Sequence, residues 1–196
     1  GVVLVYPQGA LLPGGASHWN AAPGNSNSQS FINKSNVDDL GFFNLLLDEV
    51  NQNNIIDLKR IYAIGYSNGG MFSHFLACNT DNVFAAIGDV AGTMLTDTYN
   101  TCNPSSPTPL LKIHGTSDNV VAYDGFDQQG FKTVNEVVEF WKLNQSTYLH
   151  IASEFFVPSI NNFNDLSLKS CSGTLKVNKM TPLFCWTHST LSSASK

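Results

Sequence analysis

The stretch "GYSNGG" at residues 65–70 places a serine between glycines, where an apolar run ends and a segment able to form a helix begins. Gly65, Ser67 and Gly69 fit the pattern G-x-S-x-G. In that pattern a sharp strand-to-helix turn forces the serine into strained backbone angles, so the residues two before and two after it must be small. The pattern predicts that Ser67 is a nucleophile whose hydroxyl is lifted above the sheet.

A nucleophilic serine needs an oxyanion donor, a base and a carboxylate that orients the base. The helix behind the turn would supply backbone N–H groups, and we expect that of Asn68 to be one of them. In such sites the acid follows the serine along the chain, and the histidine follows the acid. Asp118 lies in a turn after a predicted strand, so we expect it to be the acid. Asp124 is the competing carboxylate, and its surroundings are more typical of a turn residue.

The five histidines are His18, His74, His114, His150 and His188. His18 precedes the acid, which is the wrong order. We expect His74 to pack against the core and His114 to be structural at the end of a strand. His188 follows the last predicted strand, where the third triad member should arrive, so it is the preferred base. His150 is the alternative.

Apolar runs that alternate with amphipathic stretches predict the elements around this site. The expected strands are 1–7, 60–65, 83–92, 110–115 and an edge strand at 173–180, and the expected helices begin after Asn36 and at 133. The run 1–7 is apolar on both faces, as in buried parallel strands. Asn36 would cap the helix that follows it. The alternation predicts an α/β fold, with a mostly parallel sheet covered by helices on both faces.

The composition of the 196 residues excludes several functions. The net charge of −5 without a basic block argues against nucleic acid as a partner. No apolar run approaches the roughly 18 residues that span a bilayer, so no membrane association is expected. The sequence lacks H-E-x-x-H, a carboxylate cluster and G-x-G-x-x-G, so we expect no metal and no cofactor. Charged residues make up only 13%, which suits an exported protein.

We expect the first residues to form an apolar strand, and no signal peptide is visible in this sequence. We therefore expect residues 1–196 to be one domain that is N-terminally incomplete. The four cysteines are Cys78, Cys102, Cys171 and Cys185. No C-x-x-C pair indicates zinc or redox chemistry, and the even number permits two disulfides. For Cys78 and Cys102 a disulfide and two buried thiols are both open at this point.

In order along the chain, "VVLVYPQG", "WN", "VDDLGFF", "IYAIGYSNGGM", "LAC", "FAAIGDVAGTM", "CNPSSPTPLLKIHGTSD" and "YDG" resemble a family of secreted esterases. These are α/β-hydrolases grouped with polyhydroxybutyrate depolymerases, feruloyl esterases and acetylxylan esterases. The resemblance covers about residues 1 to 145 and implies ester hydrolysis through Ser67 and Asp118. It also implies a disulfide between Cys78 and Cys102, and a secreted or periplasmic protein.

The sequence departs from this family at two places. A glycine-rich "HGGG"-like segment that supplies the second oxyanion N–H is missing before "VVLVYPQG", and the glycines around the family's catalytic histidine are absent near His188. Cys171 is expected to be free or paired with Cys185. Tyr66 and Trp19 could flank an acyl group at the mouth of the site or simply be core residues.

The prediction is therefore a serine carboxylic ester hydrolase that uses Ser67, Asp118 and His188. Its expected substrates are short-chain acyl, feruloyl, acetyl or hydroxyalkanoate esters, either free or linked to a polysaccharide or polyester. The alternatives are a non-catalytic binding module or inactive fragment of the same fold, and a peptidase on that fold.

Overall fold

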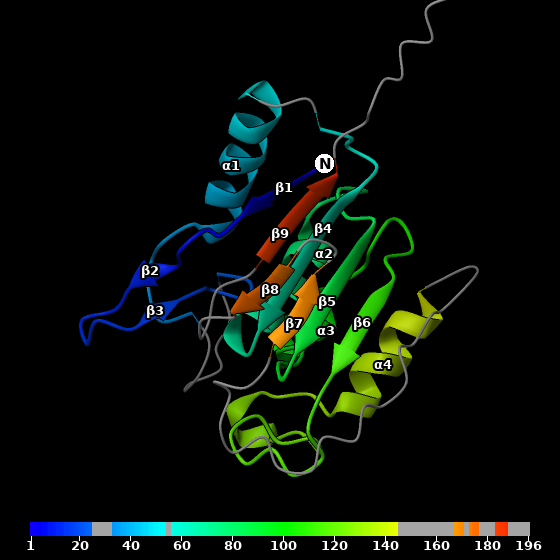
Figure 1. The fold of residues 1–196 in the computed structure, drawn as a ribbon. Coiled ribbons are helices and arrows are strands. Elements are labelled where there is room, and N and C mark those ends of the chain that lie inside the picture. Colours follow the sequence, from blue (N-terminus) through cyan, green and yellow to red (C-terminus); the bar gives the residue numbers. More distant parts are fainter. Residues whose placement is uncertain (25–32, 54–55, 145–166, 171–172, 177–182, 188–196) are drawn as a thin grey trace, which may run out of the picture.

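The computed structural model describes residues 1–24, 33–53 and 56–144, together with the backbone of three strands at 167–170, 173–176 and 183–187. The described elements, in chain order, are β1 (Val2–Val5), β2 (Ala10–Leu11), β3 (Ser17–His18), α1 (Asp39–Asn53), β4 (Ile61–Tyr66), α2 (Asn68–Asn79), β5 (Ala86–Val90), α3 (Thr96–Thr101), β6 (Leu110–Ile113), the 3-10 helix η1 (Asp127–Gln129), α4 (Val134–Leu143), β7 (Ser167–Ser170), β8 (Gly173–Lys176) and β9 (Leu183–Thr187). A five-stranded sheet lies at the centre and helices pack against it (Figure 1). Among these described helices, none is long and apolar enough to cross a membrane.

The central sheet has the strand order β1-β9-β4-β5-β6. β4, β5 and β6 pair in parallel, as the alternation of strands and helices predicts. β9 lies between β1 and β4 and is antiparallel to both, so its arrow points the opposite way in Figure 1. The edge strand expected at 173–180 is β8, and it pairs with β7 in a separate two-stranded sheet.

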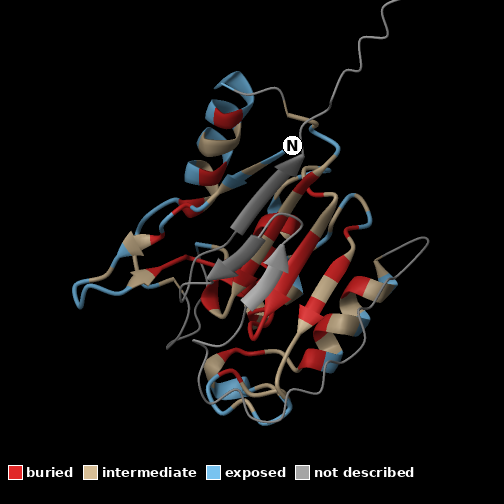
Figure 2. Ribbon diagram, in the orientation of Figure 1, coloured by how far each residue is buried: buried red, intermediate tan, exposed pale blue. Residues whose placement is uncertain are grey.

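The first strand is not buried on both faces, as its sequence had suggested. Val2 and Leu4 are 48% and 40% exposed, whereas Val3 and Val5 pack against the core. β1 lies at an edge of the sheet, whereas the more buried strands β4 and β5 each have a strand on both sides (Figure 2). An apolar run alone therefore did not distinguish an edge position from a central one.

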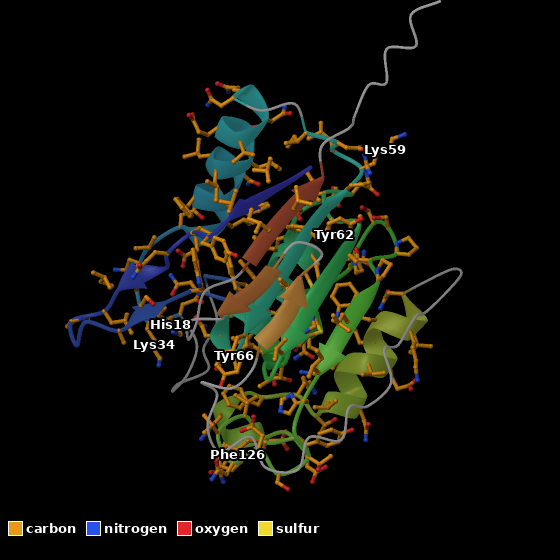
Figure 3. The ribbon with its side chains drawn as sticks, viewed as in Figure 1. His18, Lys34, Lys59, Tyr62, Tyr66 and Phe126 are labelled. Atoms are coloured by element: carbon orange, nitrogen blue, oxygen red, sulfur yellow. A yellow bond between two sulfur atoms is a disulfide. The ribbon has the colours of Figure 1, made fainter. Side chains whose placement is uncertain are left out.

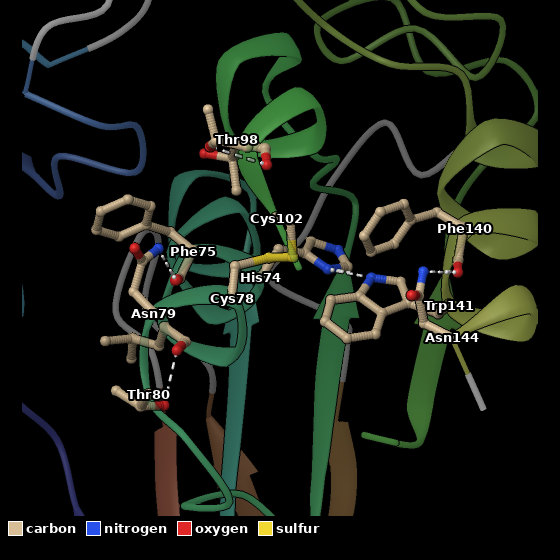
Figure 4. The surroundings of a disulfide bond; sticks show 12 residues. His74, Phe75, Cys78, Asn79, Thr80, Thr98, Cys102, Phe140, Trp141 and Asn144 are labelled. Atoms are coloured by element: carbon tan, nitrogen blue, oxygen red, sulfur yellow. Dashed lines mark hydrogen bonds between the residues drawn. A yellow bond between two sulfur atoms is a disulfide. The ribbon is translucent and has the colours of Figure 1, made fainter. Parts of the chain in front are cut away.

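Contacts among the α-helices join all four of them into one layer. Trp19 stacks on Phe72 of α2 and Phe42 of α1, with ring centroids 4.7 and 6.2 Å away. A disulfide links Cys78 of α2 to Cys102 after α3, and α4 reaches α2 and α3 through aromatic contacts (Figure 4). Within the described residues, helices therefore form a layer against one face of β4 and β5, whereas we had expected helices on both faces.

The first helix begins three residues later than Asn36. The Asp38 carboxylate accepts the Gly41 N–H at 2.8 Å, so Asp38 caps α1 in place of Asn36. An aspartate at this position also suits the positive end of the helix dipole. Phe43 and Val50 are buried, which confirms the apolar stripe that predicts this helix.

The disulfide between Cys78 and Cys102, implied by the family resemblance, is present in the structure. The two cysteines are 24 residues apart. In the loop-entropy model a bond of this span stabilises the fold by about 3 kcal/mol. We therefore expect the free energy of unfolding of the double variant Cys78→Ala/Cys102→Ala, measured by urea titration, to be about 3 kcal/mol lower than that of the wild type.

Reductant provides the control for this stability prediction. Dithiothreitol should lower the urea midpoint of the wild type towards that of the double variant and leave the double variant unchanged. Wild-type protein whose Cys78 and Cys102 thiols are both alkylated while it remains folded would contradict the prediction.

Candidate active site

Ser67 occupies the turn between β4 and α2 with backbone angles of φ 53° and ψ −119°. A non-glycine residue with positive φ is strained by about 1–3 kcal/mol, and such strain persists only where the surroundings hold it. Here the Ser67 N–H donates to the Val90 carbonyl at 2.8 Å, and the Ser67 carbonyl accepts the Met71 N–H at 3.1 Å. The turn is thus fixed to the end of β5 on one side and to the first turn of α2 on the other.

Two glycines near the serine, Gly65 and Gly92, are required by space. A Cβ added to Gly65 would lie 2.1 Å from the carbonyl carbon and oxygen of Gly69. A Cβ added to Gly92, after β5, would lie 2.7 Å from the Ser67 carbonyl oxygen. These approaches exclude a side chain at either position, so the physical reason given for G-x-S-x-G applies to Gly65.

Asn68, the first residue of α2, is held by its side chain. Its Oδ1 accepts the Trp19 N–H at 2.7 Å, and its Nδ2 donates to the Trp19 carbonyl at 3.0 Å. The N–H of the first helical residue has no acceptor within its own helix. The paired amide bonds therefore fix the backbone that carries the expected oxyanion donor.

The structure places Trp19 in the core rather than at an opening. Its side chain is 0% exposed and stacks on Phe72. Trp19 is thus linked to the turn through its backbone, which holds the Asn68 side chain.

Asp118 lies in a tight turn after β6. Its Oδ1 accepts the N–H groups of Val120 and Val121 at 2.8 and 3.0 Å. Its Oδ2 is 3.7 Å from Nε2 of His114, and the side chain is 16% exposed. One carboxylate oxygen thus fixes the turn, and the other is not used by these two backbone bonds.

Ser67 and Asp118 follow strands whose carboxyl ends meet at the same edge of the sheet, the position at which α/β sheets bind ligands. Tyr66, directly before Ser67, is close enough to Asp118 for its charge to act on the phenol. Burial and the Asp118 charge both raise the pKa of Tyr66. Figure 3 shows Tyr66 at this end of β4 and Tyr62 towards the other. The structure therefore brings the two predicted groups to one side of the sheet.

His188 and the alternative His150 lie outside the described residues, so the base remains a prediction. The neighbouring strand β9 ends at Thr187, which pairs with Val2, and its Trp186 pairs with Ile61 at the start of β4. Ser67 follows the other end of β4, roughly 20 Å away at the usual rise of a strand. The register therefore fixes only Thr187, and His188 stays a prediction.

The buried groups beneath the turn were not singled out from the sequence. Asp89 of β5 and Lys112 of β6 are directly paired in register, and both are buried. His74 and His114 contact them, which agrees with the structural role expected of both histidines. A single charge of opposite sign in each of two apolar runs, "AAIGDVAG" and "LLKIHG", is the signal that could have revealed the pair.

Comparisons with known proteins bear on the chemistry of this site. The chain is 32% identical to feruloyl esterase B of Piromyces equi over 127 residues. These aligned residues are 64% of this chain and 22% of that protein. It is 28% identical over 123 residues to the bifunctional acetylxylan esterase/xylanase XynS20E of Neocallimastix patriciarum, covering 63% and 16%. Feruloyl esterase D of Neurospora crassa is 31% identical over 86 residues, covering 44% and 29%.

This chain resembles feruloyl and acetylxylan esterases. The similarity agrees with the family suggested by the motifs around Ser67 and Asp118. No protein-family model matches the chain. The chain spans less than a third of the length of these three esterases. Among the residues that the structure describes, no three His, Cys, Asp or Glu side chains gather as a metal site.

Proposed function

We propose that this protein is an α/β-hydrolase that hydrolyses carboxylic esters through Ser67, Asp118 and a histidine, with His188 as the first candidate. The observation that carries the proposal is the strained backbone of Ser67, held between glycines at the start of α2. Such a turn raises the free energy of the folded state, and residues with strained backbones cluster at active sites, where a reacting group must be held in position. The similarity to named esterases supports the same chemistry.

In the proposed reaction the Ser67 hydroxyl oxygen attacks the ester carbonyl carbon while the histidine accepts the hydroxyl proton. The histidine then gives this proton to the departing alcohol, which leaves an acyl group on Ser67. Water, deprotonated by the same histidine, releases the acid and regenerates Ser67. Asp118 orients the imidazole and stabilises its charged form, and the Asn68 N–H donates to the oxyanion.

The proposed substrates are acetyl or feruloyl esters, because the similar proteins are named for these activities. An exported protein is part of the proposal, since the disulfide between Cys78 and Cys102 suits an oxidising compartment.

Replacing the two unplaced histidines tests both the proposed function and the base. We expect the wild-type chain to hydrolyse p-nitrophenyl acetate and to be labelled by a fluorophosphonate probe, which requires an activated serine. His188→Ala should lower kcat and the labelling rate by at least about 100-fold, because general base catalysis by a positioned side chain contributes 10²–10⁴-fold. His150→Ala is the matched control and should leave both rates within about twofold of the wild type.

The reverse pattern would transfer the role of the base to His150. A wild-type chain that neither turns over the ester nor reacts with the probe would contradict the proposed function and favour a non-catalytic binding module.

A further inference from the structure

A continuous chain of buried polar side chains runs beneath the proposed site. Trp141 of α4 donates its indole N–H to Nδ1 of His74 at 3.0 Å, as the dashed line in Figure 4 shows. Nε2 of His74 lies 2.9 Å from Oδ2 of Asp89, and Nζ of Lys112 lies 2.7 Å from the same oxygen. The side chains of His74, Asp89 and Lys112 are at most 4% exposed. Helices α2 and α4 are thereby linked to the middle of the sheet.

The hydrogen bonds among these buried side chains determine where each of their protons lies. An indole nitrogen only donates, so Nδ1 of His74 accepts and its Nε2–H donates to Asp89. The Lys112 ammonium has three protons, and three acceptors surround it: Asp89 Oδ2, the Gly92 carbonyl at 2.6 Å and Nδ1 of His114 at 2.9 Å. Nε2–H of His114 then donates to the Val121 carbonyl at 2.7 Å. Each group therefore has one protonation state that satisfies all its neighbours.

The charges of these buried hydrogen-bonded side chains balance. Burial alone would raise the pKa of Asp89, but the Lys112 charge and the His74 hydrogen bond outweigh burial and hold that pKa well below its ordinary value. Burial and the positive charge of Lys112 lower the pKa of His114, so this ring is neutral. Burial also lowers the pKa of Lys112, but the three acceptors around Nζ match an ammonium, so one buried carboxylate faces one buried ammonium. A buried ion pair of this kind adds little net stability, because desolvation offsets its attraction.

At one end of this buried hydrogen-bonded series, Asp89 and Lys112 hold the turn at Ser67. Oδ1 of Asp89 accepts the Gly92 N–H at 2.8 Å, while Lys112 donates to the Gly92 carbonyl, so the peptide groups on both sides of the Gly92 Cα are held. The segment before Gly92 includes Ala91, a second non-glycine residue with positive φ, at 51°. It also contains Val90, whose carbonyl binds the Ser67 N–H.

At the other end of the buried hydrogen-bonded series, His114 holds the turn that carries Asp118. His114 binds the Val121 carbonyl, and the Val121 N–H in turn binds Oδ1 of Asp118. Lys112 therefore donates hydrogen bonds on both sides, to Gly92 on the β5 side and to His114 on the β6 side.

We propose that Lys112 is a positioning residue of the esterase site, which sets the spacing between Ser67 and Asp118 by bridging the two turns that carry them. This inference rests on the proposed function. A misplacement of about 1 Å can cost 10²-fold in rate, so loss of the bridge should slow the reaction without removing a reacting group.

The test separates positioning from stability by comparing single and double variants in the full chain. Lys112→Met removes the bridge and leaves Asp89 as an unpaired buried charge, so both kcat and the melting temperature should fall. Asp89→Asn/Lys112→Met removes both charges, so we expect its melting temperature to recover towards the wild type. Its kcat on p-nitrophenyl acetate should remain at least about tenfold low, with KM within about threefold.

Lys142→Met is the matched control, because the Lys142 side chain pairs with Glu139 at the surface, and this variant should keep wild-type kcat. If the double variant does not fold, His114→Asn provides the second route. Asn can still accept from Lys112 but is too short to reach the Val121 carbonyl, so kcat should fall at least about tenfold.

Wild-type kcat in the folded double variant, or in His114→Asn where the double variant does not fold, would overturn the positioning role. Turnover by the wild type that Ser67→Ala abolishes would at the same time preserve the proposed function. Equal rates for the wild type and Ser67→Ala would instead overturn the proposed function, and this inference with it.

Discussion

Ser67→Ala is expected to abolish ester turnover while leaving the fold intact. Removing the nucleophile of such a triad lowers kcat by on the order of 10⁴-fold or more, because the covalent route is lost altogether. The substitution deletes a hydroxyl whose residue is held by backbone bonds to Val90 and Met71, and these bonds remain in the variant. Steady-state kinetics on p-nitrophenyl acetate, with melting temperature measured in parallel, checks the prediction.

Ser105→Ala is the control for this change. Ser105 is exposed and bonds to Asp81, away from the turn, so its variant should keep wild-type kcat. A Ser67→Ala protein that retains wild-type turnover would end the mechanism proposed for this chain. Loss of turnover accompanied by loss of folding would mean that the backbone strain at Ser67 tolerates no replacement.

Local sequence signals predicted the parts of the site that local geometry determines. The turn at Ser67 could be found because strain and lack of space restrict which residues fit there, and the Gly65–Gly69 approach shows that restriction. Strands β4, β5 and β6 and helix α4 were predicted for a similar reason, since each has its own periodicity or apolar run. The turn of Asp118 follows from the strand before it.

The parts that depend on tertiary pairing were not predicted. β9 enters the sheet antiparallel between β1 and β4, and nothing within its own five residues specifies those neighbours. The exposure of Val2 and Leu4 follows from where β1 lies in the sheet rather than from its composition. The cap of α1 shifted to Asp38 because two candidate cap residues, two positions apart, compete for the same helix start.

The pairing of Asp89 with Lys112 shows the same limit at the site itself. Each residue alone is an unexplained charge in an apolar strand, and its meaning appears only when β5 and β6 are placed in register. Motifs of reacting groups do not contain Asp89 or Lys112, because neither residue reacts in the proposed mechanism.

Asp118→Asn should lower kcat by about 10³–10⁴-fold with little change in stability. The asparagine Oδ1 can still accept the N–H groups of Val120 and Val121, so the turn is retained. What is lost is the negative charge that stabilises the imidazolium, and the amide N–H would favour the wrong tautomer of the base. Kinetics on p-nitrophenyl acetate and thermal melting of the variant measure the two effects separately.

Asp124→Asn makes the same chemical change six positions further along the same loop, where the carboxylate is exposed. We expect its kcat to stay within about twofold of the wild type, since exposed substitutions away from a site have small effects. If Asp124→Asn is the damaging change and Asp118→Asn is not, then Asp118 acts only through the two backbone bonds that shape its turn. The acid of the triad would then be Asp124, and the bridge from Lys112 through His114 would lead to a structural turn instead of a catalytic one.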